Sequence, residues 1–320
     1  MIITSCPLRV SLVGGSTDHP EFIKRYGSGS VISFPSNLNT YISIHQDYFG
    51  MNSIDKKYII NYSKKENVNN IKDIQNELIR NTFEHFNVEE INCSLTSDVF
   101  SVGSGLAASS SYIMALIHAI YVMRGKTISS VELCMFAEQI EKKFNPLVGQ
   151  QDFYGSSIGG LKQINFEKDK IPSMTFLKRT LFDEMNIYLF YTGISRSSTN
   201  VLKSINVEKS LPLLDDVKDL EKSINDVDIN GFNEIINHTW ENKKNTSKYI
   251  CENKKLVEID NLLKNNTEVL SHKLCGAGNG GYFLVFSHKN VDLSKKYSYI
   301  RQIQISDTGI QHINLKNEFR

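Results

Sequence analysis

Residues 103–111 read GSGLAASSS and combine the glycines of a tight turn with hydroxyl side chains at the start of an apolar segment. Glycine allows positive φ and a close approach of the backbone. A helix that begins here would present free N–H groups and a positive dipole end, which together bind anions. One of the serine hydroxyls could also hold Mg²⁺. The stretch therefore predicts a phosphate-binding loop made of Gly103, Ser104, Gly105, Leu106, Ala107, Ala108, Ser109 and Ser110.

The same turn fits two other interpretations. It lacks the G-x-x-x-x-G-K-[ST] pattern of the common P-loop. It does match G-x-G-x-x-A, from Gly103 to Ala108, which makes an NAD(P)-dependent oxidoreductase an alternative. A dinucleotide-binding unit needs a strand after the helix with an acidic residue at its end, whereas here a second helical pattern follows. A simple glycine-rich connector is the other alternative.

Two further glycine-rich segments change the balance between these interpretations. CGAGNGGYFLVF, residues 275–286, is a glycine turn that enters an apolar strand, and GSTDHPEF follows the first strand with Asp18 after Gly14 and Gly15. Each one alone is a turn. Together with the serine-rich loop they suggest three flexible backbone segments that meet at one phosphorylated ligand.

The composition excludes several classes of function. The 320 residues include 36 Lys and Arg and 35 Asp and Glu, so no basic excess indicates a nucleic acid or a membrane surface. The five cysteines form no CxxC pair and no zinc spacing, which indicates reduced thiols in a cytoplasmic protein. No segment is long and apolar enough to span a membrane, and the first residues do not resemble a signal peptide. We expect a small-molecule partner, and the oligomeric state stays open.

The elements that must position these residues are strands and helices in mixed order. β-branched and aromatic residues predict strands over 8–15, 29–36, 39–46 and 57–63. Apolar residues at helical spacing predict a helix over 71–86, and a strand over 89–100 leads into the glycine-rich turn. A largely buried helix follows the turn, and a further helix begins near Ser129 or Ser130 with Glu132 in its first turn.

The second half opens with a strand over 185–193, continues with helical segments over 198–265 and ends with three strands. A polar stretch before Pro172 marks a domain boundary. Strands and helices do not alternate regularly. An α+β fold in two domains therefore fits better than a doubly wound sheet.

Three motifs in order, PLRVSLVGGSTD, GSGLAASSSY and CGAGNGGYFLVF, resemble those of the GHMP small-molecule kinases, and the likeness spans nearly the whole chain. The closest likeness is to the D-glycero-D-manno-heptose 7-phosphate kinases, with hallmarks NYSKKE, IEKKFNPLVGQQDFYGSSIGG and FYTGISRSS. The resemblance implies a ribosomal-protein-S5-like N-terminal domain that binds ATP and sugar, and a ferredoxin-like C-terminal domain. The expected division is 1–168 and 169–320.

The resemblance also assigns the central acidic residues. The family's active-site aspartate precedes a Gly-Gly pair by seven residues, and Asp152 stands in that place. Eleven residues earlier, Glu141 occupies the position of a metal-binding glutamate. Without the family, Asp152 would be interpreted as a helix cap and Glu141 as part of a solvated helix face. The spacing favours the functional interpretation of both.

Five other positions carry over in the same way. Arg9 stands where the family has a basic residue near the transferred phosphoryl group, and the alternative interpretation, a strand arginine that pairs with a carboxylate, is compatible with that role. Asp18, with Thr17 before it, matches an aspartate that binds sugar hydroxyls. Gly278 of the third motif is a further candidate for substrate binding. Arg196 is a candidate for the distal phosphate of the substrate, because the guanidinium fork suits phosphate oxygens, and a surface arginine is nearly as good an interpretation.

The implied reaction is transfer of the γ-phosphoryl group of ATP to the anomeric hydroxyl of heptose 7-phosphate, which gives the 1,7-bisphosphate. Asp152 and Arg9 would act at the reacting groups, and Ser109 and Glu141 would hold Mg²⁺. Galactose-, fucose- or hexosamine-type sugars are the alternative substrates. A non-catalytic binding protein with the kinase fold is a further alternative.

One departure from the family lies in the phosphate loop itself. The heptose kinases usually have Gly-Ser where this chain has Ala107 and Ala108. The substitution removes the conformational freedom of glycine at one position and a hydroxyl at the next. It bears on nucleotide affinity, whereas Ser109 stays at the position of the metal ligand.

Overall fold

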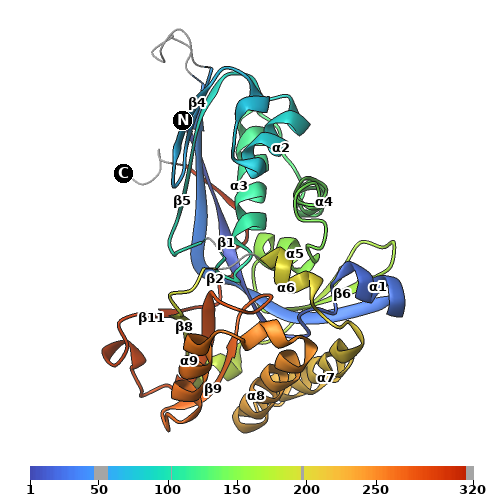
Figure 1. Ribbon diagram of the computed structural model, residues 1–320, viewed down its shortest axis with the longest axis vertical. Coiled ribbons are helices and arrows are strands. Elements are labelled where there is room, and N and C mark those ends of the chain that lie inside the picture. Colours follow the sequence, from blue (N-terminus) through green and yellow to red (C-terminus); the bar gives the residue numbers. More distant parts are fainter. Residues whose placement is uncertain (47–56, 102, 196–197, 315–320) are drawn as a thin grey trace.

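Two β-sheets form the framework of the protein, as the computed structural model shows for residues 1–46, 57–101, 103–195 and 198–314 (Figure 1). The first sheet has the order β12-β1-β2-β5-β3-β4, with β6 paired to β2 and β7 paired to β6. Its strands are β1 (Ile2–Val13), β2 (Ser28–His45), β3 (Tyr58–Asn61), β4 (Lys65–Val68), β5 (Ile91–Ser97), β6 (Lys162–Glu167), β7 (Ser173–Phe176) and β12 (Gln311–Ile313). The second sheet has the order β11-β8-β10-β9 and contains β8 (Met185–Tyr191), β9 (Val269–Leu274), β10 (Tyr282–His288) and β11 (Ile300–Ile303).

The helices fall into two groups along the chain. The first group is α1 (Pro20–Tyr26), α2 (Glu77–Phe86), α3 (Ala108–Met123), α4 (Ser130–Glu141) and α5 (Gln151–Ser157). The second is α6 (Ser198–Lys203), α7 (Pro212–Asn225), α8 (Ile229–Thr246) and α9 (Lys254–Lys264). Short 3₁₀ turns occur at Ile71–Asp73, Thr180–Glu184, Glu208–Ser210, Lys248–Cys251 and Leu293–Lys295. The structure therefore confirms the mixed α+β architecture that the sequence predicts.

Strand β2 corrects the prediction of two separate strands over 29–36 and 39–46. Pro35 and the two asparagines that follow are typical turn residues, yet they lie inside one continuous strand. Both halves pair with β1, Pro35 opposite Arg9 and Asn39 opposite Pro7, with an irregular register between them. Gln304 hydrogen-bonds to the backbone and side chain of Asn37. The turn-forming groups are thus satisfied by a distant segment, which a local pattern does not show.

Helix α2 is shorter than the predicted helix over 71–86. Residues Ile71–Asp73, at the start of the predicted range, form a separate 3₁₀ turn, and the α-helix begins only at Glu77. The side chain of Asn76 accepts a hydrogen bond from the N–H of Ile79 and caps the helix. The Ser129–Glu132 capping box at the start of α4 is present as predicted.

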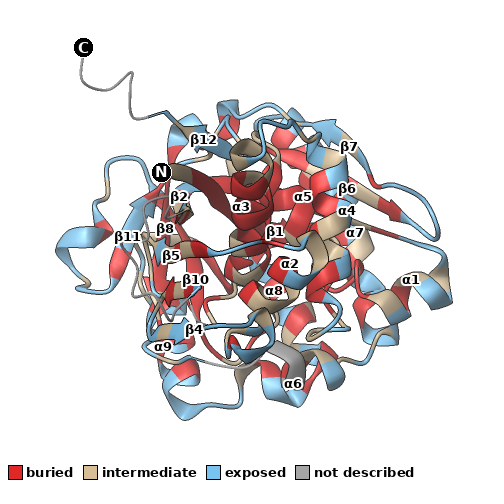
Figure 2. Ribbon diagram, turned by 90° about the horizontal axis from the view of Figure 1, so that it is seen from above, coloured by how far each residue is buried: buried red, intermediate tan, exposed pale blue. Residues whose placement is uncertain are grey.

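Helix α3, which follows the glycine-rich turn, is buried along most of its length (Figure 2). It packs against β1 and β2 on one side and against α4 and α5 on the other. Its sequence is apolar nearly all round, as expected for a helix enclosed on several faces. The Thr4 hydroxyl donates to Ala115 O at 2.7 Å, which fixes β1 against the helix. The middle of α3 is therefore tied to β1.

A buried apolar cluster joins the two halves of the chain. It contains Val10 and Leu12 of β1 together with Leu189 of β8, Val217 of α7 and Phe286 of β10. β7 and β12 lie beyond residue 168 but belong to the first sheet. The division into 1–168 and 169–320 stays a proposal. The two parts share an apolar core, and both contribute strands to the first sheet.

None of the helices in the described ranges is long and apolar enough to cross a lipid bilayer. All five cysteines lie in these ranges and none of them forms a disulfide bond; four are buried, whereas Cys251 is half-buried. Their burial agrees with the packing role that the sequence predicts.

Candidate active site

A cavity of about 430 Å³ lies between the two groups of helices and is lined by both halves of the chain. The glycine-rich turn contributes Gly103, Ser104, Gly105 and the residues from Ala107 to Ser110. Leu106 is fully buried in the core. Its carbonyl accepts a hydrogen bond from Arg9 N at 3.1 Å, which ties the turn to β1. The turn and the start of α3 thus present backbone N–H groups at the cavity wall, as an anion site requires.

The third glycine motif supports this turn from behind. A Cβ atom on Gly105 would lie 2.4 Å from Cys275 O, and one on Gly281 would lie 2.2 Å from Ser104 O. Tyr282 N donates to Ser104 O at 3.2 Å. The two turns therefore pack backbone against backbone, which is possible only without side chains at these positions.

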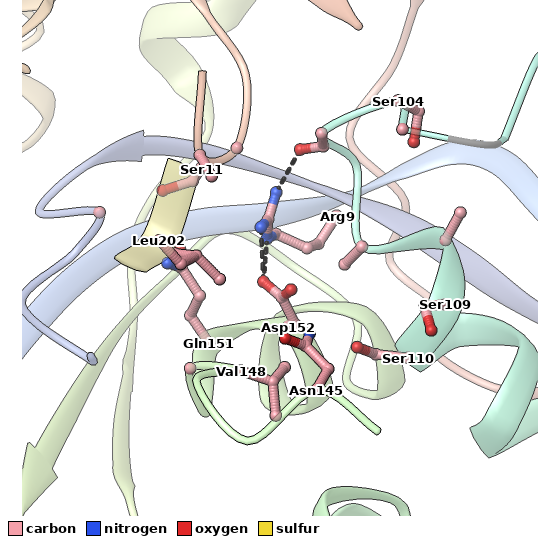
Figure 3. A pocket seen from close by; sticks show the side chains of 18 of the residues that line it. Arg9, Ser11, Ser104, Ser109, Ser110, Asn145, Val148, Gln151, Asp152 and Leu202 are labelled. Atoms are coloured by element: carbon pink, nitrogen blue, oxygen red, sulfur yellow. Dashed lines mark hydrogen bonds and ion pairs between the residues drawn. The ribbon is translucent and has the colours of Figure 1, made fainter. Parts of the chain in front are cut away.

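Arg9 and Asp152 form the polar centre of the cavity (Figure 3). Arg9 Nε and Nη2 both donate to Asp152 Oδ1, at 3.0 and 2.5 Å, and Nη1 donates to Gly105 O at 2.8 Å. The irregular register of β1 at Pro7–Arg9 is a feature that often re-aims a side chain beside a site. Asp152 Oδ2 has no hydrogen bond from any described residue, so this oxygen is available to a ligand.

Asp18 lies next to this pair and is buried. Gln151 donates to it twice, from its backbone N to Oδ2 at 3.2 Å and from Nε2 to Oδ1 at 2.8 Å. Burial raises the pKa of Asp18 to about 6, and the charge of Asp152 acts in the same direction. A Cβ atom on Gly149 would lie 1.9 Å from Asp18 Oδ2, so the loop before α5 closes directly over this carboxyl group.

Glu141, at the end of α4, is 2 % exposed. Ser110 Oγ donates to its Oε2 at 2.6 Å, and Asn145 Nδ2 donates to its Oε1 at 3.4 Å. Burial raises the pKa of Glu141 to about 7, and Asp152 acts in the same direction, whereas the hydrogen bond from Ser110 opposes them. Ser109 and Ser110, at the start of α3, line the same cavity as Asp152 and Asn145 (Figure 3). A carboxylate, a hydroxyl and an amide oxygen are ligands that suit a magnesium ion.

Two sequence-based candidates lie outside the cavity, and a third lies outside the described residues. The hydroxyl of Thr17 is within hydrogen-bond distance of Gly14 O and Ser30 O, and it accepts a bond from Ser30 N, so it holds the turn before α1. Gly278 packs against Ile250, and Gly276 and Ala277 line the cavity in its place. Arg196 lies outside the described residues.

Several cavity residues were not found by sequence reasoning. Gln151 and Asn145 each have a buried side-chain oxygen without a hydrogen-bond partner in the described part of the chain. Two buried lysines, Lys243 and Lys273, come from the second half. The motif GQQD contains Gln151 next to Asp152, which was a usable signal, whereas the lysines lie more than 220 residues from β1 and left none.

The cavity extends between two chemically different ends. Tyr62, Leu78, Leu95 and Tyr112 line it near α2 and β5 and suit a planar base. Leu213 of α7 and Thr239 and Lys243 of α8 line it near the second helix group. Figure 1 places α2 in the upper part of the molecule and α7 and α8 in the lower part.

Ala107 has a backbone conformation that L-residues avoid, with φ 61° and ψ 33°. Replacing Ala107 with glycine should raise the free energy of unfolding by about 0.5–1 kcal/mol, because relief of the left-handed strain exceeds the extra entropy of the unfolded chain. Ala108 is the first residue of α3, so Ala108→Gly is the control and should lower stability. Chemical denaturation of both variants checks this, and equal destabilisation would show that the φ of Ala107 stores no strain.

The two buried carboxyl groups predict an unusual dependence of stability on pH. The pKa values of Asp18 and Glu141 are raised from 3.8 and 4.5 to about 6 and about 7. At a pH between its ordinary and its raised pKa, each carboxyl group is deprotonated in the unfolded chain but still protonated in the folded chain. The free energy of unfolding therefore falls as pH rises from about 4 to 7. Each group should contribute up to about 3 kcal/mol.

Asp18→Asn and Glu141→Gln should therefore gain stability relative to the wild type as pH increases, when ligand-free proteins are unfolded in urea at pH 4.5 and pH 8. A stability difference that does not change with pH would show that these carboxyl groups titrate normally in the folded protein.

A glycine-rich loop at a helix N-terminus, which shares a cavity with an arginine–aspartate pair and a buried glutamate, is the arrangement expected of a small-molecule kinase site. Residues 70–160 match the family described as the GHMP kinases N terminal domain. Residues 70–160 thus carry the N-terminal domain of the GHMP kinases, and the protein is an ATP-dependent phosphotransferase with an alcohol group as acceptor.

Known proteins support this assignment along the whole chain. The chain is 27 % identical to the D-glycero-alpha-D-manno-heptose 7-phosphate kinase of Campylobacter jejuni, over 99 % of this chain and 97 % of that protein. Its fold is similar to that of a D-glycero-D-manno-heptose 1-phosphate kinase from Bacteroides thetaiotaomicron, with a TM-score of 0.77 and 18 % identity over 98 % and 99 % of the chains. It is also similar to galactokinase from Lactococcus lactis, with a TM-score of 0.73 and 13 % identity over 98 % and 95 %. The protein is thus a sugar kinase of this family.

Proposed function

We propose that the protein phosphorylates the anomeric hydroxyl of D-glycero-D-manno-heptose 7-phosphate and releases the 1,7-bisphosphate and ADP. The observation that carries the choice of sugar is the 27 % identity to the heptose 7-phosphate kinase of Campylobacter jejuni, which extends over nearly the full length of both proteins. The observation that supports the reaction is the pair Arg9–Asp152 beside the glycine-rich loop.

Asp152 is the group that faces the acceptor hydroxyl in this proposal. Both bonds from Arg9 go to Oδ1, which fixes the carboxylate and leaves Oδ2 to accept the hydroxyl proton. Arg9 is also held by Gly105 O of the phosphate loop, so one guanidinium group links the loop and the acidic group. Its charge lies where negative charge spreads over the transferred phosphoryl group.

The remaining polar residues orient the two substrates. The turn from Gly103 to Ser110 receives the triphosphate through its N–H groups. Asp18, aligned by Gln151, receives hydroxyl groups of the sugar. Glu141 and Ser109 would hold Mg²⁺, with Ser110 orienting the carboxylate, and the bound ion would supply positive charge against the phosphate oxygens.

The alternative oxidoreductase is not supported by the fold. The G-x-G-x-x-A turn lies between β5 and α3, but the next element along the chain is the helix α4. The turn therefore belongs to no βαβ unit.

The test is a coupled assay of ADP release with a panel of acceptors, in which heptose 7-phosphate stands beside free heptose, galactose, fucose and hexosamines. We expect kcat/KM for heptose 7-phosphate to exceed that for each free sugar at least about tenfold. The free energy of one hydrogen bond to a charged group is enough to produce this ratio. A free hexose as the best substrate would replace the heptose proposal by the galactose- or fucose-type alternative.

A further inference from the structure

Lys243 is a buried lysine in the wall of the cavity. It lies on α8, is 8 % exposed and reaches the turn after β1. Its ammonium group donates to Ser16 Oγ and lies 3.5 Å from Gly15 O. Burial of an ammonium group is costly, and a lysine at this depth in a ligand cavity is typical of sites that receive an anion.

His19 lines the same part of the cavity and is 3 % exposed. Its Nδ1 accepts a hydrogen bond from Glu21 N at 3.2 Å, which places the proton of the neutral ring on Nε2. Nε2 is buried and has no hydrogen-bond partner in the described part of the chain. Burial lowers the pKa of His19, and the charge of Lys243 lowers it further. The ring is thus a neutral donor that lacks an acceptor.

The two residues lie on the acceptor side of the cavity. Ser16 and His19 flank Asp18, whose carboxyl group is bonded to Gln151 next to Asp152. The phosphate loop and α3 form a different wall, which begins at Ser101 and Gly103. A ligand group that meets Lys243 therefore belongs to the sugar, at a position away from the hydroxyl that faces Asp152.

We propose that Lys243, Ser16 and His19 form a subsite for the distal phosphate of a phosphorylated sugar, and that this subsite selects sugar phosphates over free sugars. An ammonium group, a hydroxyl and an imidazole N–H supply donors for the oxygens of a phosphomonoester. Asp18 faces the same region and would bond sugar hydroxyls instead. This inference rests on the proposed function, and Arg196, the sequence-based candidate for the same phosphate, plays no part in it.

The experiment compares Lys243→Met and His19→Asn with the wild type, using heptose 7-phosphate and free heptose as acceptors. Asparagine is a good helix cap, so His19→Asn keeps an acceptor for Glu21 N while it removes the Nε2–H donor. Lys222→Met, on the exposed side of α7, removes the same charge away from the cavity and is the control.

For heptose 7-phosphate we expect KM to rise about 10–100-fold in Lys243→Met and about tenfold in His19→Asn. We expect kcat, KM for ATP and KM for free heptose to stay within about threefold of the wild type. Lys243→Arg should recover most of the affinity. If Lys243→Met does not fold, His19→Asn alone decides, because its cap is preserved.

Three results would overturn the subsite. Equal losses for both acceptors would show a structural role, and a rise in KM for ATP alone would assign the cluster to the nucleotide. Unchanged KM for heptose 7-phosphate in both variants, while the wild type uses this substrate, would reject the subsite and leave the proposed function intact. If the wild type uses only free sugars and heptose 7-phosphate does not compete with them, both proposals fail.

Discussion

Replacement of Asp152 by asparagine is expected to lower kcat by about 10³-fold, while KM for ATP changes little. Asparagine keeps an oxygen that can accept both hydrogen bonds from Arg9, so the geometry at Oδ1 is preserved. What is lost is the second carboxylate oxygen, which faces the acceptor hydroxyl and takes its proton. The loss therefore falls on the chemical step and not on binding of the nucleotide.

The control for this variant is Asp215→Asn, which removes a carboxylate that is 76 % exposed on α7 and paired with Lys218. It should have wild-type kinetics. A thermal unfolding curve for Asp152→Asn close to that of the wild type confirms that the fold is intact. Wild-type turnover by a folded Asp152→Asn protein would remove this carboxylate from the mechanism.

Glu141→Gln is expected to give the second large effect, a fall in kcat/KM of about 10²-fold with a higher requirement for Mg²⁺. Glutamine matches the size of glutamate and can still accept the hydrogen bond from Ser110, but it carries no charge for the metal ion. The same variant should be more stable than the wild type at pH 8 without ligands, because it removes a buried charge. Lower activity together with higher stability is a combination that a damaged fold does not produce.

Glu138→Gln is the matched control, since Glu138 lies on the same helix and pairs with Lys142. Titration with Mn²⁺, followed by electron paramagnetic resonance, gives a measure of metal affinity that does not depend on turnover. Equal Mn²⁺ affinity in Glu141→Gln and the wild type would show that Glu141 is not a metal ligand.

Much of this site was predictable from sequence because its parts are local patterns. The glycine turn before an apolar helix, the spacing from Glu141 to Asp152 and the Asp18 turn are each encoded within a few residues. The propensity of glycine for positive φ and of an apolar helix for burial does not depend on the rest of the chain. The α+β class and the helix start at Ser129 follow from the same local rules.

The tertiary structure decided which side chains reach the cavity. Three residues of the predicted motifs do not line the cavity. Leu106 is buried in the core, and Thr17 holds the turn before α1 by hydrogen bonds. Gly278 packs against Ile250. Ala107 carries the left-handed conformation that its sequence does not suggest. Neighbours in sequence point in different directions, and which of them meets the cavity depends on partners far along the chain.

Two central contacts were likewise beyond the reach of a local sequence pattern. Arg9 and Asp152 are 143 residues apart, and Lys243 is 227 residues from Ser16. The sequence by itself determined the loop, the acidic residues and the order of the motifs. Only the packing of the second half against β1 brought Lys243 to Ser16 in the turn before α1, because contacts at such separation are set by the shared core and not by residue spacing.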